Sequence, residues 1–415
     1  MKTSFPLNSM PAAPVTGHAG FHSASAATNV VSSSAMNAVK RSLLVMRAVA
    51  PAMVILSAWT VAARAADSET QGKTVAFVPG VMGNAFYVSM ECGIRAEAAK
   101  YGFKINIQGA QQFDPSLQTP IVNAVVAAKP AGLLIAPTDS KAMFVPISEA
   151  VSSGIKVALV DTTLDDTSKV ITAIATDNTA GGAAAADALA KLIGEKGEVM
   201  VIAFQAGAST SDQRQRGFEG EIKKYPNIKY VGFQISNNDP SKAAAEVGST
   251  LAAHPDLAGI FATNDRSAEG AATGLRVADK VGVVKIVGFD AGDTQIKQLK
   301  DGLVQALIAQ RPYQIGVDGV DAIANALTGK SVEHSVTTDT VTITKENLQE
   351  PEIQKALYAQ MRLTLGWLSV PGARTVCGHS MPWQPSSHLP TPQVSPAGES
   401  RKGIRACGTS CQTPL

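Results

Sequence analysis

Six polar residues of this chain stand at or just after the ends of apolar runs, where their side chains could bind a ligand. The set consists of Asn84, Asp139, Asp161, Arg214, Asn264 and Asp290. Carboxylates and amides can pair with neighbouring hydroxyl groups, and an arginine adds a fixed fork of donors. Phe86 and Tyr87 add flat faces that could cover the C–H side of a ring. The set suits a neutral ligand that carries several hydroxyl groups.

Each Asp or Asn of this set also has a purely structural interpretation. Such a residue at the turn after a strand often caps the next helix and does nothing else. Their joint occurrence in both halves of the chain favours a shared ligand site, because ligands of open α/β sheets collect at the carboxyl ends of the strands.

The motifs that would favour an enzyme are missing from the sequence. No G-x-G-x-x-G follows the apolar runs that end at Val78 and Phe204, and no Walker A motif occurs. The main body holds two histidines, His254 and His334, which are too few to build a Ser/His/Asp set. We therefore expect no catalysis and no cofactor.

The cysteines and the charge balance exclude other classes. Of four cysteines, Cys92 stands alone and the other three fall near the end of the chain, so no disulfide framework is expected in the main body. The spacing Cys407-x-x-x-Cys411 lacks a second ligand pair nearby, so no metal is expected. Lys and Arg together number 36 against 34 Asp and Glu, which argues against a nucleic-acid partner.

The elements that must position these residues begin with a strand, loop and helix between Thr74 and Tyr101. Four apolar residues in a row suit a strand buried on both faces of a parallel sheet, and Asn84 is a plausible N-cap for the helix that ends at Gly102. The expected buried face holds Phe86, Val88, Cys92 and Ala96 or Ala99. Since adjacent residues cannot both face inward from one helix, Phe86 and Tyr87 should not both be buried.

Strands and helices then alternate, and the second half of the chain repeats the first. Asp114-Pro115 recurs as Asp239-Pro240, each opening a helix, and the run from Gly132 to Asp139 recurs from Gly259 to Asp265 at a nearly constant shift. The predicted fold class is α/β, with two similar lobes. Each lobe is a parallel sheet flanked by helices, and a three-strand hinge near Thr176, Gln310 and Val336 joins them.

The amino-terminal region has the form of a secretory signal. Lys40 and Arg41 precede the apolar stretch Leu43–Val61, and Ala63-Arg64-Ala65 offers a cleavage site. A membrane anchor is the alternative, but the uninterrupted run is short for a span of ~20 residues. The expected parts are an extension at 1–35, a signal peptide at 36–65, an N-terminal lobe at 72–175 plus 311–336, a C-terminal lobe at 177–309 plus 337–360, and a disordered tail at 361–415.

Six motifs occur in order along the chain, namely Asn84-Ala85-Phe86-Tyr87, Ala136-Pro137-Thr138-Asp139-Ser140, Arg214-Gln215-Arg216-Gly217, Phe261-Ala262-Thr263-Asn264-Asp265, Val287-Gly288-Phe289-Asp290 and Ile308-Ala309-Gln310. Together they resemble the type I periplasmic sugar-binding proteins of ABC transporters, the ribose-binding group in particular. The resemblance runs from Lys73 to Ile343 and implies that sugar contacts come from Asn84, Phe86, Tyr87, Asp161, Arg214, Asn264 and Asp290, with Gln310 at the hinge.

Three positions depart from that group. Thr162 stands where the ribose binders place an Arg, Asn238 where they place a Phe, and Gly80 where they carry a Ser. These differences argue against ribose itself as the ligand, but they leave the predicted class, a sugar-binding protein, unchanged.

The resemblance implies a monomer in the periplasm that captures a neutral monosaccharide or polyol and delivers it to the membrane permease of an ABC importer. An alternative is a receptor subunit that feeds a chemoreceptor or sensor kinase. The same fold serves lactose-repressor-type regulators, but those carry a helix-turn-helix headpiece where this chain has a signal peptide.

Overall fold

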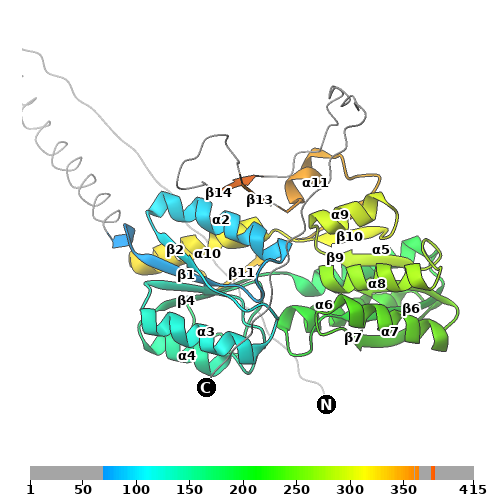
Figure 1. The fold of residues 1–415 in the computed structure, drawn as a ribbon, viewed down its shortest axis with the longest axis horizontal. Coiled ribbons are helices and arrows are strands. Elements are labelled where there is room, and N and C mark those ends of the chain that lie inside the picture. The colour runs from blue at the N-terminus through cyan, green and yellow to red at the C-terminus, as the bar shows by residue number, and fades with distance from the viewer. Residues whose placement is uncertain (1–68, 359, 364–374, 379–415) are drawn as a thin grey trace, which may run out of the picture. The chain divides into compact units, whose positions relative to one another are not determined.

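The computed structural model describes residues 69–358, 360–363 and 375–378, so the expected extension at 1–35 and signal peptide at 36–65 lie outside the described residues. Within these ranges no helix is both long and apolar enough to cross a bilayer. The fold consists of two six-stranded sheets with helices on both faces, which confirms the predicted fold class (Figure 1).

The first sheet is parallel throughout and has the strand order β11-β5-β4-β3-β1-β2. Its strands are β1 (Thr74–Val78), β2 (Lys104–Ile107), β3 (Gly132–Ile135), β4 (Lys156–Val160), β5 (Thr172–Thr176) and β11 (Ser335–Thr338). The pairing of Val75 with Gly132 sets the register of β1 against β3. β1, β3 and β4 are buried over nearly their whole length, as their continuous apolar runs predict.

Four helices cover the two faces of this sheet. Helices α2 (Ala85–Tyr101) and α10 (Pro312–Leu327) lie on one face, and α3 (Pro115–Ala128) and α4 (Phe144–Ser152) lie on the other (Figure 1). Alternate strand residues face the two layers: Phe77 packs with Met90 and Ile94 of α2, while Val78 packs with Val122 of α3. The period of two along a strand therefore divides the core of this lobe into two halves.

The second sheet has the order β12-β10-β9-β8-β6-β7, and β12 is its one antiparallel strand. Its strands are β6 (Gly197–Ala203), β7 (Ile228–Ile235), β8 (Leu257–Ala262), β9 (Lys285–Phe289), β10 (Ala306–Ala309) and β12 (Val341–Thr344). Helices α5 (Asn178–Leu192) and α6 (Ser209–Glu221), followed by the 3₁₀ turn η1 (Ile222–Lys224), pack on one face; α7 (Pro240–Ala253), α8 (Asp265–Val277) and α9 (Asp293–Lys300) pack on the other.

Each lobe contains a pair of helices that cross very closely. Gly93 of α2 lies against the backbone of Tyr313 in α10, and Gly217 of α6 lies against the backbone of Thr179 in α5. A β-carbon at either glycine would collide with a carbonyl oxygen. Corresponding positions of the two lobes therefore use glycine for the same reason, which supports the duplication inferred from the sequence.

The chain passes between the lobes at three places. These are the link from β5 to α5, the link from β10 to α10, and the residues between Thr338 of β11 and Val341 of β12. The third link follows Thr338, slightly later than the position near Val336 expected from the sequence. Helix α11 (Pro351–Ala356) follows β12 and contacts it.

Some details of the first helix differ from expectation. Helix α2 begins after Asn84 and ends at Gly102, whose φ is 68°, as predicted. Its buried residues include Met90 and Ile94 rather than Ala96 and Ala99. Phe86 and Tyr87 are both buried, against expectation, because each meets a different partner: Phe86 packs against Tyr358, and the Tyr87 hydroxyl bonds to Asp161.

Two further expectations need correction or restriction. Cys92 is disulfide-bonded, which a lone cysteine in the main body did not indicate. Within the range expected to be a disordered tail, β13 (Gln360–Leu363) pairs antiparallel with β14 (Thr375–Gly378). Alternating polar and apolar residues in β13 are typical of a strand, a signal that a composition-based reading of the tail passes over.

Candidate ligand-binding site

Asn84 stands in the loop after β1 and serves two purposes. Its side-chain oxygen accepts a hydrogen bond from the backbone N–H of Phe86 at 2.9 Å, which caps α2. Its side-chain nitrogen donates to Asp265 Oδ2 of the other lobe at 2.8 Å. Capping therefore fixes the direction in which the amide crosses the cleft.

Asn264 repeats this arrangement in the second lobe. Its side-chain oxygen caps α8 by accepting from the N–H of Ser267 at 2.9 Å, and its nitrogen donates to Asn238 Oδ1 at 2.7 Å. Asn264 is 8% exposed and lies in an extended conformation at the end of β8.

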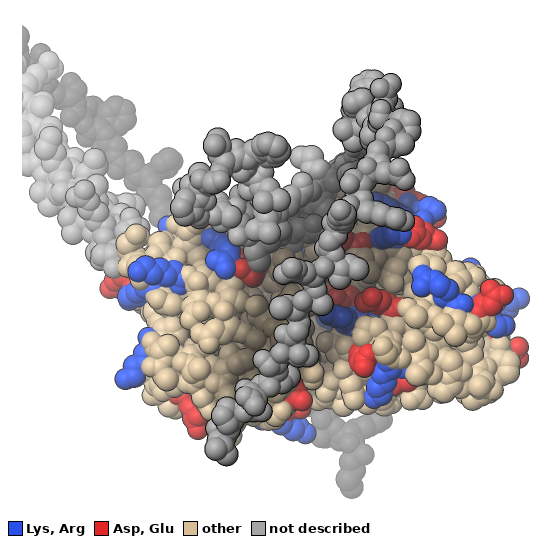
Figure 2. Space-filling view, viewed as in Figure 1, with Lys and Arg blue, Asp and Glu red and all other residues tan. Residues whose placement is uncertain are grey.

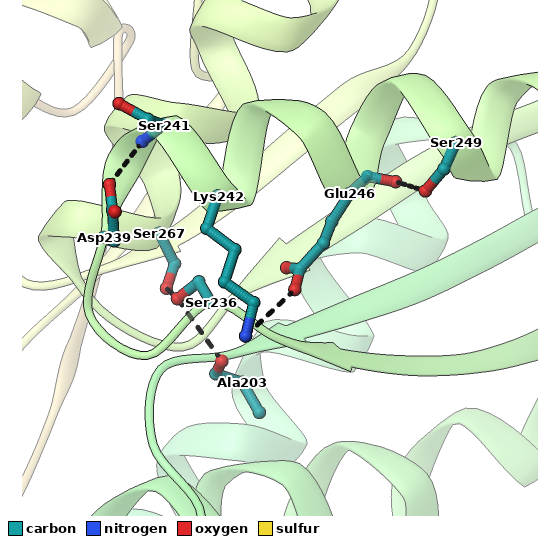
Figure 3. Close-up of polar contacts among 8 residues, drawn as sticks. All are labelled: Ala203, Ser236, Asp239, Ser241, Lys242, Glu246, Ser249 and Ser267. Atoms are coloured by element: carbon teal, nitrogen blue, oxygen red, sulfur yellow. Dashed lines mark hydrogen bonds and ion pairs between the residues drawn. The ribbon is translucent and has the colours of Figure 1, made fainter.

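The loop that presents Asn238 is held by small polar side chains at the start of α7 (Figure 3). The Ser236 hydroxyl lies 3.0 Å from that of Ser267, and Asp239 accepts from the N–H of Ser241 at 2.8 Å to cap the helix. Asn238 has a φ of 58°, a left-handed conformation that Asn tolerates better than most residues. A bulkier or branched residue would strain the backbone at this position.

Asp161 follows β4 and points into the cleft with a φ of 69°. The Tyr87 hydroxyl donates to Asp161 Oδ2 at 2.7 Å. Burial raises the pKa of Asp161 to about 6, while the positive charge of Arg214 and the Tyr87 hydrogen bond act in the opposite direction.

Asp290 follows β9 in the second lobe and also has a left-handed backbone, with a φ of 83°. Gln310 Nε2 donates to Asp290 Oδ1 at 2.6 Å, and Thr176 donates to Gln310 Oε1 at 2.7 Å. Two of the three links between the lobes thus connect to a cleft carboxylate by hydrogen bonds.

Arg214 is buried on α6 and is held in one orientation. Its Nε donates to Asn178 Oδ1 and its Nη1 donates to the carbonyl oxygen of Thr263, both at 2.8 Å. The guanidinium lies 3.7 Å from the centre of the Phe289 ring, over its face. With its plane fixed in this way, the guanidinium can present its remaining donors to the cleft without losing conformational freedom on binding.

These groups surround one cavity with about 380 Å³ of space not filled by atoms, part of which is open to solvent. All eight predicted site residues line it, namely Asn84, Phe86, Tyr87, Asp161, Arg214, Asn264, Asp290 and Gln310. Six further residues complete the lining, namely Val81, Phe113, Phe204, Thr210, Asn238 and Asp265.

Asp139 and Thr162 do not line the cavity. Asp139 Oδ1 accepts from the N–H groups of Lys141 and Ala142, so this carboxylate holds the turn before α4, whose N-cap is Met143. The Thr162 hydroxyl donates to the carbonyl oxygen of Pro137 at 2.7 Å and is fully buried.

Sequence reasoning missed two rings and one carboxylate. Phe113 and Phe204, one from each lobe, meet edge to face with their centres 5.5 Å apart. Phe204 directly follows a buried strand, the same signal that identified the polar residues. Asp265 was overlooked because it follows a residue already assigned, although its position after β8 is equally favourable.

The cavity carries more negative than positive side chains. Asp161, Asp265 and Asp290 face one buried cation, Arg214. Loss of hydration, followed by the nearby charge of Asp290, raises the pKa of Asp265 to about 7. Such a site favours ligands that donate hydrogen bonds over ligands that are themselves anionic. On the face shown in Figure 2, basic and acidic residues are interspersed among uncharged ones.

The lobes contact each other around the cavity. The N–H of Ser140 donates to the carbonyl oxygen of Gly207 at 2.9 Å, and the N–H of Thr163 donates to Ser209 Oγ at 2.8 Å. Because of these contacts, the described structure is the closed arrangement of two lobes around a polar cavity.

In the described parts of the chain, no group of three or more His, Cys, Asp or Glu side chains could hold a metal ion.

Two duplicated α/β lobes that close on a cavity of hydroxyl-binding groups define a two-lobed solute-binding protein. The chain belongs to the periplasmic binding protein family, whose domain model matches residues 75–331. It is a binding protein and not an enzyme, as the sequence predicted.

Individual relatives agree with this membership. The chain is 33% identical to the ribose import binding protein of Salmonella typhimurium, over 70% of this chain and 97% of the relative. A solved solute-binding protein of an ABC transporter from Agrobacterium vitis, bound with α-D-tagatopyranose, is 38% identical, with a TM-score of 0.68 over 69% of this chain and all of that one. A carbohydrate transporter solute-binding protein from Agrobacterium radiobacter, in complex with D-arabinose, is 30% identical, with a TM-score of 0.66 over 69% and 99%.

Proposed function

We propose that this protein captures a neutral monosaccharide or polyol between its lobes and delivers it to an ABC importer. The observation that carries the proposal is that Asp161 and Asp290, one from each lobe, line a single closed cavity together with the fixed guanidinium of Arg214. A carboxylate can bind two vicinal hydroxyl groups, so a polyhydroxylated ring satisfies both lobes at once. Binding then stabilises the closed arrangement.

The charge of the lining supports a neutral ligand. A sugar phosphate or sugar acid would need cations to replace its lost hydration, and Arg214 already faces three carboxylates. Hydroxyl groups, by contrast, donate to Asp161 and Asp290 without adding charge.

The aromatic lining supports a pyranose-sized ring. Phe113 and Phe204 supply flat apolar walls, which offset the missing ring at Asn238. The relatives named above carry ribose, tagatopyranose or arabinose in their names, and all of these are neutral monosaccharides.

The family and the predicted signal that begins at Lys40-Arg41 support the proposal that the protein is exported and acts in the periplasm. Its partner there would be the membrane permease of an ABC importer. Removal of residues 36–65 as a signal peptide, and a monomeric solute-bound form, belong to the same proposal.

A thermal-shift panel of neutral pentoses, hexoses, polyols and sugar phosphates tests the ligand class. A true ligand at about a hundred times its dissociation constant should stabilise the folded protein by ~2.7 kcal/mol. Calorimetry on each hit should give one site per chain. If only phosphorylated or acidic compounds raise the melting temperature, the proposal of a neutral ligand is wrong.

A further inference from the structure

Tyr358 lies two residues after the end of α11, beyond the family match that ends at residue 331, and it is only 3% exposed. Its ring packs edge to face against that of Phe86, with the centres 6.0 Å apart. Its hydroxyl donates to Asp290 Oδ1 at 2.8 Å. The Tyr358 side chain thus contacts one cavity-lining residue from each lobe, although Tyr358 itself does not line the cavity.

The two oxygens of Asp290 have different surroundings. Oδ1 accepts from both Gln310 Nε2, at 2.6 Å, and the Tyr358 hydroxyl. Oδ2 has a longer contact, 3.3 Å, from the N–H of Asp265. Since a carboxylate oxygen has two lone pairs, the two donors saturate Oδ1 and leave capacity on Oδ2.

The Tyr358 hydroxyl stays a donor throughout the physiological pH range. Burial raises its pKa well above the usual value, and the negative charge of Asp290 adds to this effect. An ionised phenolate would repel Asp290, whereas the neutral hydroxyl holds it in place.

We propose that Tyr358 is a positioning residue for sugar binding, which together with Gln310 fixes Oδ1 of Asp290 and thereby directs Oδ2 toward the ligand. The inference rests on the proposed function, in which Asp290 contacts the sugar. It assigns a binding role to the segment that follows β12, outside the region that the family model covers.

If Tyr358 served packing alone, its hydroxyl group would not be needed. A phenylalanine would keep the contact with Phe86 and fill the same space, so only the hydroxyl distinguishes positioning from packing. The informative variant is therefore Tyr358→Phe, measured in the full chain with the best neutral sugar from the panel.

We expect Tyr358→Phe to weaken sugar binding about tenfold, and to lower the sugar-induced rise in melting temperature more than the melting temperature of the free protein. Tyr225→Phe is the matched control, because the Tyr225 hydroxyl also donates to a carboxylate, Asp187 Oδ1, at 2.8 Å but lies away from the cavity. The control should bind the sugar within twofold of the parent.

A double-mutant cycle with Asp290→Gly distinguishes positioning through Asp290 from a purely structural role of Tyr358. Glycine suits the left-handed backbone at this position. If Tyr358 acts through Asp290, Tyr358→Phe should change affinity less than twofold in the Asp290→Gly background. A tenfold loss of affinity from Tyr358→Phe in both backgrounds, or unchanged affinity of Tyr358→Phe alone, overturns the inference. The proposed function is preserved in either case if the parent binds the sugar. A parent that binds no sugar of the panel overturns both.

Should Tyr358→Phe fold poorly, Gln310→Leu tests the same carboxylate from its other donor. It should reduce affinity in the parent and much less in Asp290→Gly. Equal losses in both backgrounds would again contradict positioning through Asp290.

Discussion

Asn84 and Asp265 are joined directly across the cleft, with Asn84 Nδ2 donating to Asp265 Oδ2 at 2.8 Å. One residue begins the first helix of one lobe, and the other begins α8 of the second lobe. The contact therefore depends on the relative position of the lobes, and it can form only when they are close together.

The two roles of Asn84 can be separated by substitution. Asn84→Ala should lower the free energy of unfolding by ~1 kcal/mol through loss of the cap, whereas Asn84→Ser keeps a capping oxygen and should cost less. Both variants should weaken sugar binding several-fold, because alanine has no side-chain donor and the serine hydroxyl is on a shorter side chain than the amide nitrogen that reaches Asp265. Chemical denaturation and calorimetry measure the two effects; full affinity in Asn84→Ser would contradict a role for this contact in closure.

Stability should fall as the pH rises from about 5 to 8. The folded-state pKa values of Asp161, about 6, and Asp265, about 7, lie above their ordinary value. The folded protein therefore binds more protons than the unfolded chain, and the stabilisation present at low pH is lost as the pH passes through these values. Thermal melts at pH 5.5 and 8.0, recorded at saturating sugar so that the lobes are closed and both carboxyl groups are buried, should show the higher melting temperature at pH 5.5.

Asp265→Asn should flatten the upper part of this pH dependence, since it removes the group that titrates near pH 7. Asp256→Asn, an exposed aspartate after α7, is the control and should leave the profile unchanged. A profile of the same slope in Asp265→Asn would assign the titration to other groups.

Asp290 and Thr162 should differ strongly in their effect on affinity. Asp290→Asn keeps the left-handed backbone but removes the charge, and charge-assisted hydrogen bonds are worth ~1.5–3 kcal/mol, so sugar binding should weaken ~10-fold or more. Thr162→Val removes a bond to Pro137 that lies outside the cavity, so it should lower the melting temperature with little change in affinity. If Asp290→Asn binds the sugar as well as the parent, the assignment of the site is wrong.

Much of the site could be predicted because its residues follow buried apolar strands. The strands ending at Val78, Val160 and Phe289 are continuous apolar runs, so the next polar residue in each case marks the sheet edge at which ligands bind. Local pattern is enough for this step, since the parallel sheet brings those ends together.

Contacts between distant segments could not be predicted from such patterns. Nothing in the sequence near Tyr358 indicates that its hydroxyl reaches Asp290, because that contact depends on where the chain passes after α11. The burial of both Phe86 and Tyr87 likewise depends on Tyr358 and Asp161, which surround the first turn of α2 from different sides. The rule that one helix buries one face applies in the middle of a helix and not at an end between two lobes.

Export should remove the residues before about Ala66. Lys40-Arg41, the apolar stretch and Ala63-Arg64-Ala65 have the order of a signal peptide, and small residues are required at the cleavage site. Mass spectrometry of the periplasmic protein should therefore find an amino terminus at about Ala66. Ala65→Ser should be processed normally, while Ala65→Arg should accumulate uncleaved; an intact terminus in the membrane fraction of the parent would indicate an anchor instead.

The lobes should close on the sugar by bending at the three links between them. Thr176 and Gln310 stand at two of these links and are hydrogen-bonded to each other, so the links can act as one hinge while each sheet stays rigid. Small-angle scattering should show a smaller radius of gyration at saturating sugar than without it. At a sugar concentration near the dissociation constant of the parent, Asp290→Asn should stay near the sugar-free value, because it lacks the interactions that favour the closed state. Thr162→Val should compact as the parent does. An identical radius of gyration for the parent with and without saturating sugar would show that the lobes are already closed before binding, and that the contacts of Asn84 with Asp265 and of Ser140 with Gly207 hold without a ligand.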